Sequence, residues 1–213
     1  GATRRRVPEI WDVDKPMQSG SVQNQDAYMQ AVAAQRPYFF EHIADIADVV
    51  MAEYYELTGR RYRRLSGYLA DDADYLILGQ GSMIVQAEAV PFPGDQIGMM
   101  LKGKKGVTVL ERTDQPLAED LPIMREVRSA LTKCLENGSV AKGERHPYPG
   151  YATYKPGDMP HLYSGCYGLG SRDLQPEGLV ATAENMLASG RQQRFFYLSV
   201  DFLRQASDPK EEI

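Results

Sequence analysis

The stretch DYLILG at residues 74–79 decides the fold of this chain. It is a short apolar run with charge before it and a glycine after it, which is typical of a buried strand that ends in a tight turn. Residues 83–90 follow with a helical pattern. The sequence therefore predicts a unit of strand, turn and helix at this point.

The same unit returns twice along the chain. GVTVL at residues 106–110 precedes an expected helix over 120–136, and LYSGCY at 162–167 precedes one over 176–187, with a last strand expected over 195–200. Strands that alternate with helices form mainly parallel sheets. We therefore expect an α/β fold with a mainly parallel open sheet and helices on both faces.

The N-terminal region lacks this alternation. Residues 1–38 contain Pro8, Pro16, Gly20 and Pro37 and little apolar periodicity, so we expect an irregular, extended arm. From Phe39 onward apolar residues recur at three- and four-residue steps until the chain reaches a glycine, which is typical of an amphipathic helix with a left-handed cap.

Composition excludes several classes of function. The 213 residues carry a formal net charge of −5, which does not favour nucleic acid, and no apolar run approaches the ~20 residues that span a membrane. Cys134 and Cys166 form no C-x-x-C pair, so this chain alone supplies neither an iron–sulfur cluster nor a zinc site. Two cysteines without a disulfide framework indicate a cytoplasmic protein.

One turn is the best candidate for a binding site. Gly168, Gly170, Ser171, Arg172 and Asp173 lie between an expected strand and an expected helix, where backbone N–H groups can hold an anion. The alternative is a packed turn whose arginine pairs with an acid on a neighbouring domain, because a guanidinium is well suited to hold a carboxylate. We favour the packed turn and keep the anion site as the alternative.

Other candidates favour structural interpretations. The turn GQGS at residues 79–82 lacks the third glycine of a dinucleotide fingerprint, so a tight packing turn is favoured. The basic run at residues 60–64 is an isolated patch in an acidic chain, which favours a solvated helix end or an inter-subunit salt-bridge surface over nucleic-acid contact. The three histidines show no ligand spacing. We therefore expect no catalytic residue and no metal ligand set in this chain.

Six stretches carry a family resemblance, in the same order as in that family. They are GSVQNQDAYMQ at 20–30 with QRPYF at 35–39, LTGRRY at 57–62, DAD at 72–74 through GS at 81–82, PFP at 91–93, VLERT at 109–113 and GLGSRDLQP at 168–176. Together they resemble the pyruvate:ferredoxin (flavodoxin) oxidoreductases and the wider 2-oxoacid oxidoreductase family, from about residue 15 to residue 201.

The resemblance implies a domain organisation. Residues 1–38 would be the tail of a pyrimidine-binding domain, and 39–138 the first part of a transketolase-C-terminal-like domain. A Pro/Gly-rich loop (139–160), the rest of that domain (161–201) and the start of a linker (202–213) would follow. Asn24, Gln25, Arg172 and Asp173 are then expected at interfaces with neighbouring domains.

The resemblance also implies a function for the whole enzyme. This would be oxidative decarboxylation of a 2-oxoacid to acyl-coenzyme A, with thiamine diphosphate, Mg²⁺ and [4Fe–4S] clusters as cofactors and ferredoxin or flavodoxin as electron acceptor. The partners of this chain would be other domains or subunits of an enzyme that assembles as a dimer. In that family the cofactor and substrate residues lie in other segments, so this chain would be a scaffold that is inactive alone.

The sequence departs from the family at one junction. Where this chain joins Val90 directly to Pro91, the family has the rest of a helix, a strand and a loop. Either the sequence omits disordered residues here or the chain is naturally trimmed, and we favour omission because losing a β–α–β crossover would expose an apolar sheet face. Two other functions remain open: an independent nucleotide- or anion-binding module, and a non-catalytic assembly subunit.

Overall fold

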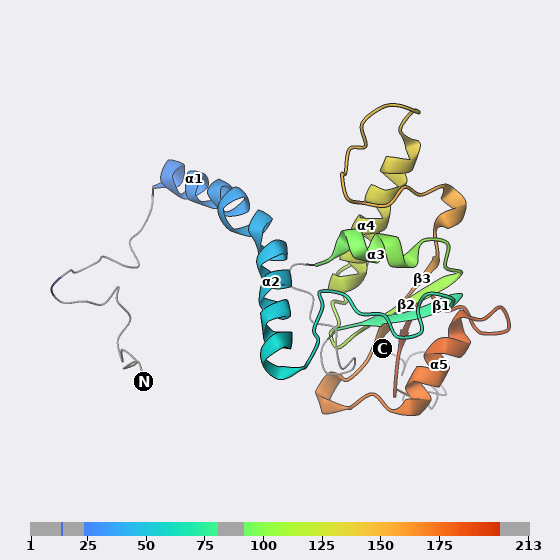
Figure 1. The fold of residues 1–213 in the computed structure, drawn as a ribbon. Coiled ribbons are helices and arrows are strands. Elements are labelled where there is room, and N and C mark those ends of the chain that lie inside the picture. Colours follow the sequence, from blue (N-terminus) through green and yellow to red (C-terminus); the bar gives the residue numbers. More distant parts are fainter. Residues whose placement is uncertain (1–13, 15–23, 81–91, 201–213) are drawn as a thin grey trace. The chain divides into compact units, whose positions relative to one another are not determined.

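In the computed structural model, which describes residue 14 and residues 24–80 and 92–200, four strands form one parallel sheet (Figure 1). They are β1 (Tyr75–Gly79), β2 (Gly106–Glu111), β3 (His161–Cys166) and β4 (Phe195–Tyr197). Neighbours in sequence are neighbours in the sheet, and all three pairings are parallel. The strands occur where the periodicity predicts them, which confirms the α/β fold.

Helices cover both faces of this sheet. On one face lie α3 (Gly94–Leu101) and α4 (Pro122–Ser139), which pack against Val107 and Val109 of β2. On the other face lies α5 (Pro176–Met186), which contacts β1 and β2 (Figure 1). Every residue of β2 is buried because this strand is covered on both sides.

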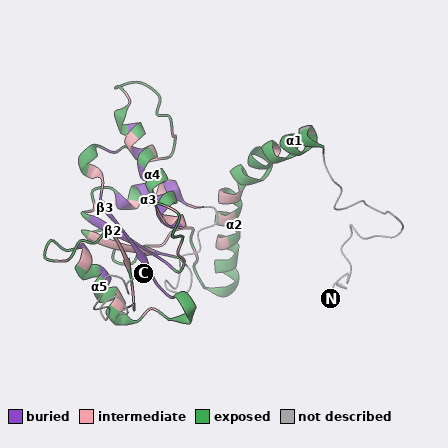
Figure 2. Cartoon of the chain, turned by 180° about the vertical axis from the view of Figure 1, so that it is seen from behind, coloured by how far each residue is buried: buried purple, intermediate pink, exposed green. Residues whose placement is uncertain are grey.

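The core lies between the sheet and the pair α3 and α4. Its buried members are Ile97, Leu101, Val107, Val109, Met124, Val127, Leu131, Cys134, Tyr154 and Leu162. In Figure 2 these elements carry most of the buried residues. The predicted helix over 120–136 is therefore confirmed as α4, and its apolar spacing places one side of the helix on the sheet.

Helix α3 was not predicted from the sequence. It follows PFP at 91–93 and contains two glycines, which have low helix propensity. The structure gives one of these glycines a packing reason, because a Cβ atom on Gly98 would lie 2.5 Å from Cys134 Sγ. The close approach of α3 to α4 thus requires glycine at position 98, and the low helix propensity of glycine is the reason that the sequence did not predict α3.

Residues 140–160 form a loop that is tied back to the core. Tyr154 is buried, and its hydroxyl donates to Gly98 O at 2.7 Å while its N–H donates to Cys134 O at 3.0 Å. The buried Asn137 amide donates to Tyr148 O and Tyr151 O and accepts from Tyr148 N. These bonds hold a Pro/Gly-rich segment against α4.

The chain divides into two units, Gly1–Ile43 and Ala44–Ile213. The first contains α1 (Gln25–Gln35) and the π-helical turn η2 (Arg36–Phe40), so the expectation of an irregular arm is wrong for residues 25–38. The physical reason is the run of helix formers after Gln25, with four alanines among eleven residues. The rest of the arm lies outside the described residues, apart from Asp14 and Asn24.

The amphipathic helix expected after Phe39 is confirmed as α2 (Glu41–Thr58). Gly59 ends it with φ 72°, and its N–H donates to Tyr55 O at 2.8 Å, as expected for a left-handed cap. None of the helices in the described part of the chain is long and apolar enough to cross a membrane. The expected helix over 83–90, the junction of Val90 with Pro91 and the expected linker over 202–213 lie outside the described residues.

Candidate functional site

The carboxyl edge of the sheet is where open parallel sheets usually bind ligands. Three neighbouring strands end there together, because Glu111 pairs in register with Cys166 and Cys166 with Tyr197. The turn that starts at Gly168 follows two residues after β3. The best candidate from the sequence therefore lies at this edge.

The turn itself has unusual backbone geometry. Gly168, Gly170 and Ser171 have φ of 72°, 61° and 63°, in the left-handed region that non-glycine residues rarely adopt. Gly168 is also needed for packing, because a Cβ atom there would lie 2.9 Å from Arg112 Cγ. Arg112 Nε donates to Gly168 O at 3.0 Å, so the end of β2 holds the turn after β3.

The two charged residues of the turn have partners within this chain. Arg172 Nη1 donates to Ser199 O at 2.7 Å, which joins the turn to the segment after β4. Asp173 Oδ1 lies 3.8 Å from Arg112 Nη2 in an exposed ion pair. Sequence reasoning missed Arg112, and the signal that could have identified it is its position directly after a buried strand.

Glu111 is a buried carboxylate at the same edge. It is 3% exposed and accepts hydrogen bonds from Ile123 N at 2.6 Å and Met124 N at 3.1 Å, so it caps the N-terminus of α4. Burial raises the pKa of this carboxyl above its ordinary value, although the two N–H donors oppose the shift. Both carboxylate oxygens are engaged, and the side chain fixes α4 to β2.

The side chains of Cys166 and Tyr197, at the ends of β3 and β4, both donate hydrogen bonds to the segment that follows β2. Cys166 Sγ donates to Thr113 O at 3.1 Å, and burial raises the thiol pKa to about 11, so it is not an activated nucleophile. The Tyr197 hydroxyl donates to Asp114 Oδ2 at 2.8 Å, and this bond raises the phenol pKa to about 12. The named groups at the edge are thus arranged as a structural network.

Two other candidates from the sequence lie at the end of β1, on this same edge, and beside α2. Gly79 ends β1 and is buried, while residues 81 and 82 of its turn lie outside the described residues. The basic run packs on α2: Arg64 Nε donates to both Asp48 carboxylate oxygens, and the Arg61 guanidinium lies 4.9 Å from the Tyr55 ring centroid. Arg64 is thus paired within this chain, and the interpretation of the run as an inter-subunit salt-bridge surface stays a prediction.

Asn24 and Gln25 stand at the start of α1. Asn24 is its N-cap residue, and its carbonyl accepts the Tyr28 N–H at 2.9 Å. Both residues are exposed, as is the neighbouring Tyr28. Their interface role stays a prediction.

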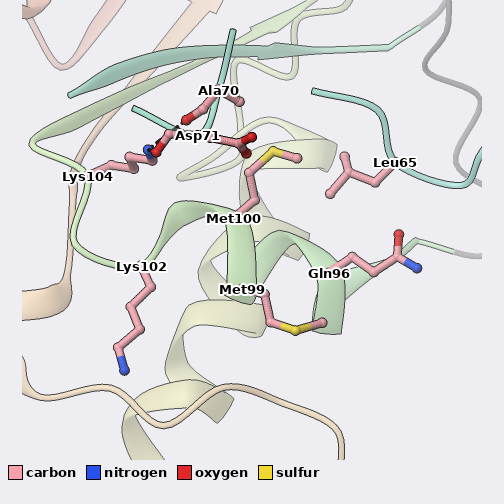
Figure 3. Close-up of a pocket in the computed structure, with 8 residues that line it drawn as sticks. All are labelled: Leu65, Ala70, Asp71, Gln96, Met99, Met100, Lys102 and Lys104. Atoms are coloured by element: carbon pink, nitrogen blue, oxygen red, sulfur yellow. Dashed lines mark hydrogen bonds between the residues drawn. The ribbon is translucent and has the colours of Figure 1, made fainter. Parts of the chain in front are cut away.

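A hollow of about 440 Å³ opens elsewhere, lined by Leu65, Ala70, Asp71, Gln96, Met99, Met100, Lys102 and Lys104 (Figure 3). Lys104 in this lining is held by two hydrogen bonds: its Nζ donates to Ala70 O at 2.7 Å and to Asp71 O at 3.0 Å. Lys104 precedes β2, so the hollow lies at the amino end of the strands, away from the Gly168 turn. The lysine holds a loop in place.

Residues 24–80 and 92–200 contain no group of three or more His, Cys, Asp or Glu side chains that could hold a metal ion. Cys134 and Cys166 are both buried and free, one in α4 and the other at the end of β3. Four cysteine ligands are needed for a [4Fe–4S] cluster, so the two cysteines of the chain do not fit one.

Comparison with known proteins gives one consistent group of relatives, whereas no protein-family model matches the chain. The chain is 26% identical, over 83% of its length, to the pyruvate-flavodoxin oxidoreductase of Trichormus variabilis. It is 26% identical over 85% of its length to the pyruvate:ferredoxin oxidoreductase of Moorella thermoacetica, and 25% identical over 84% to pyruvate synthase subunit PorA of Thermotoga maritima.

The coverage of these relatives is uneven. The chain spans 15% of the length of the Trichormus and Moorella proteins and 44% of the length of PorA. The resemblance found in the sequence motifs is confirmed over most of this chain. It reaches only a part of each relative.

Proposed function

We propose that this chain, a relative of the pyruvate-flavodoxin and pyruvate:ferredoxin oxidoreductases, forms a scaffolding segment of a thiamine diphosphate-dependent 2-oxoacid oxidoreductase. The whole enzyme would convert a 2-oxoacid of the pyruvate class to acyl-coenzyme A and pass the electrons to ferredoxin or flavodoxin. The observation that carries the proposal is the extent of the similarity. More than four fifths of this chain matches the Trichormus and Moorella proteins, and the match covers 15% of the length of those proteins.

The geometry supports a scaffolding role. The side chains at the carboxyl edge are bonded to the backbone or to each other: Glu111 caps α4, Arg112 holds the Gly168 turn, and Cys166 donates to a carbonyl. A scaffold that fixes the positions of neighbouring domains contributes to the reaction rate, because a misplacement of the reacting groups by ~1 Å can lower the rate ~100-fold.

The cofactors would then be held by other segments. Thiamine diphosphate supplies the carbanion chemistry of oxidative decarboxylation, and iron–sulfur clusters carry single electrons. The proposed partners are the other domains or subunits of a dimeric enzyme, and the proposed location is the cytoplasm, which the two free cysteines favour.

Two measurements test this proposal together. The purified native assembly should contain thiamine and iron and should reduce viologen when given pyruvate and coenzyme A. The isolated 213-residue chain should show no iron–sulfur absorbance and no turnover. Iron–sulfur absorbance in the isolated chain would contradict the scaffolding role, and a native assembly without thiamine and iron would favour a non-catalytic assembly subunit.

The arm offers a second test of the scaffolding role. Tyr28 and Met29 of α1 are 61% and 76% exposed, and burying their apolar surface against a partner would be favourable. We expect a protease to cleave residues 11–37 in the isolated chain and to spare them in the assembly. Equal protection in both would show that the arm needs no partner.

One observation favours a second function. The left-handed backbone at Gly168, Gly170 and Ser171 resembles the concave N–H arrangements that bind anions, and Arg172 lies next to it. An anion-binding module would take up thiamine diphosphate, coenzyme A or NAD as an isolated chain. Calorimetry with these three compounds separates the alternatives, because the scaffolding role predicts no tight binding.

A further inference from the structure

Helix α2 carries an apolar stripe that the described part of the chain leaves uncovered. Ile46, Val49, Val50, Tyr54 and Leu57 recur at helical spacing and are 59%, 58%, 54%, 41% and 84% exposed. At 3.6 residues per turn these positions fall on one side of the helix. Figure 2 shows α2 as mostly exposed.

The opposite side of α2 is in use within the chain. Asp48 binds Arg64 at 3.0 Å, Tyr55 lies under the Arg61 guanidinium, and Ala47 and Met51 are half-buried. The basic segment thus fixes one side of α2 and leaves the stripe facing outward. A helix held in this way presents its apolar side chains in a fixed arrangement.

The acidic and basic side chains that α2 itself contributes are all of one sign, although Arg61 and Arg63 lie near Glu56 at its C-terminal end. Helix α2 contains five acidic residues and no lysine or arginine. Asp48 is neutralised by Arg64, whereas Glu53 and Glu56 form no ion pair within the described residues. Helical geometry places Glu53 within the stripe and Glu56 along one border of it. A partner that covers the stripe without cations would bury or crowd these carboxylates at a cost.

We propose that this stripe docks on a surface outside this chain, in the same assembly, that presents apolar side chains bordered by lysine or arginine. The inference rests on the proposed function for the source of the partner and adds its chemistry. It is supported by the exposed stripe, by Glu53 and Glu56, which form no ion pair within the described residues, and by the small share of the long relatives that this chain spans. Apolar contacts at the centre of such an interface supply affinity, and the flanking charges supply orientation and rate of association.

Photo-crosslinking from α2 identifies the occupant directly. A benzophenone amino acid at Val50 in the full native protein, activated in the purified assembly, should join α2 to a segment outside this chain that combines apolar and basic residues. Crosslinks to another part of residues 1–213, to a second copy of this chain, or to a segment without lysine or arginine would each overturn the proposal. Absence of any crosslink would overturn it too.

Matched variants test the energetic role of the stripe. Val50→Lys should weaken assembly at least tenfold, whereas Val180→Lys, at a 57% exposed position on α5, should leave it within about threefold. The charge reversal Glu53→Lys with Glu56→Lys should weaken assembly and reverse its salt dependence, while Glu126→Lys on the exposed side of α4 should not. Unchanged assembly in both stripe variants would overturn the proposal.

The circular dichroism of each variant chain should match that of the wild type, because the substituted side chains are exposed. Viologen reduction is measured separately on the wild-type assembly. If the crosslink is found and no 2-oxoacid is oxidised, the enzyme assignment fails and the docking surface stands. If activity is found and the crosslink is absent, the docking surface fails alone.

Discussion

Helices α4 and α2 have the same length and the same kind of amphipathic pattern, yet they end in different surroundings. Each spans 18 residues; α4 buries Met124, Val127, Ala130, Leu131 and Cys134, whereas α2 buries no residue. The face of α4 lies on a sheet that the same chain provides, and the face of α2 has no such cover in the described residues. Apolar periodicity thus predicts that a helix has an apolar face, but it does not predict which segment or which chain covers that face.

The largest expected effect compares one leucine from each helix. Leu131 is fully buried, so Leu131→Ala should lower the free energy of unfolding by about 2 to 5 kcal/mol. Leu57 is 84% exposed, and Leu57→Ala should change it by less than about 0.5 kcal/mol in the isolated chain. Urea unfolding of the 213-residue chain measures both. Similar losses at the two positions would mean that α2 is covered by this chain itself.

A second comparison uses a glycine near the end of each helix. A Cβ atom on Gly138 would overlap the Tyr154 carbonyl oxygen, so Gly138→Ala should cost about 1 to 3 kcal/mol or detach the loop 140–160. At Gly59 no atom lies within 4 Å of the added Cβ atom, and only the left-handed backbone opposes alanine, at about 1 kcal/mol. Thermal unfolding measures the difference in stability between the two variants. An equal loss of stability would show that the loop 140–160 moves away from Gly138 at little cost.

The same contrast explains how far the sequence could be interpreted. All four strands and helices α2, α4 and α5 were predicted, because their apolar periodicity reports on burial by neighbouring segments. Helix α1 was missed because the prolines and glycine of the arm outweighed a short alanine-rich run, and α3 because it contains two glycines. One of those, Gly98, is explained only by its contact with Cys134, which no local pattern reveals.

The candidate site was predicted less completely than the fold. The Gly168 turn was located, and its glycines do adopt left-handed conformations. The partners of the turn, Arg112 and Ser199, come from the ends of β2 and β4, which are remote in sequence and meet only because the strands are neighbours. Residue type and local spacing therefore identify the turn, and the sheet order decides what it binds.

Replacing Arg172 tests whether the Gly168 turn is a packed structural turn or a functional anion site. Arg172→Ala removes a charged donor, so the proposed assembly should lose roughly 1 to 3 kcal/mol of stability while the proposed oxidation of a 2-oxoacid, measured per assembly, stays nearly intact. Part of that loss should appear in the isolated chain, because the Ser199 carbonyl is an internal acceptor. A variant that keeps its stability and loses turnover or coenzyme A saturation would make the turn a functional anion site.

Tyr197 gives the smallest effect and adds a pH dependence to the comparison. Its hydroxyl donates to Asp114, and Tyr197→Phe should cost roughly 0.5 kcal/mol, at the low end for a hydrogen bond because the side chain is partly exposed. The folded-state phenol pKa of about 12 lies above the ordinary tyrosine value of about 10.

The sign of the pH effect follows from this shift. Because the folded state favours the protonated phenol, the stabilisation is fully present below about pH 10 and is lost as the pH rises through about 12. The stability difference between wild type and Tyr197→Phe should therefore be constant from pH 7 to about 9.5 and shrink above it. Tyr68→Phe, at an 89% exposed position, serves as the control and should not change stability. A difference that grows with alkaline pH would mean that the Tyr197 hydroxyl does not donate to Asp114 in solution, and that β4 is held at the edge of the sheet by its backbone pairing with β3 and by apolar contacts.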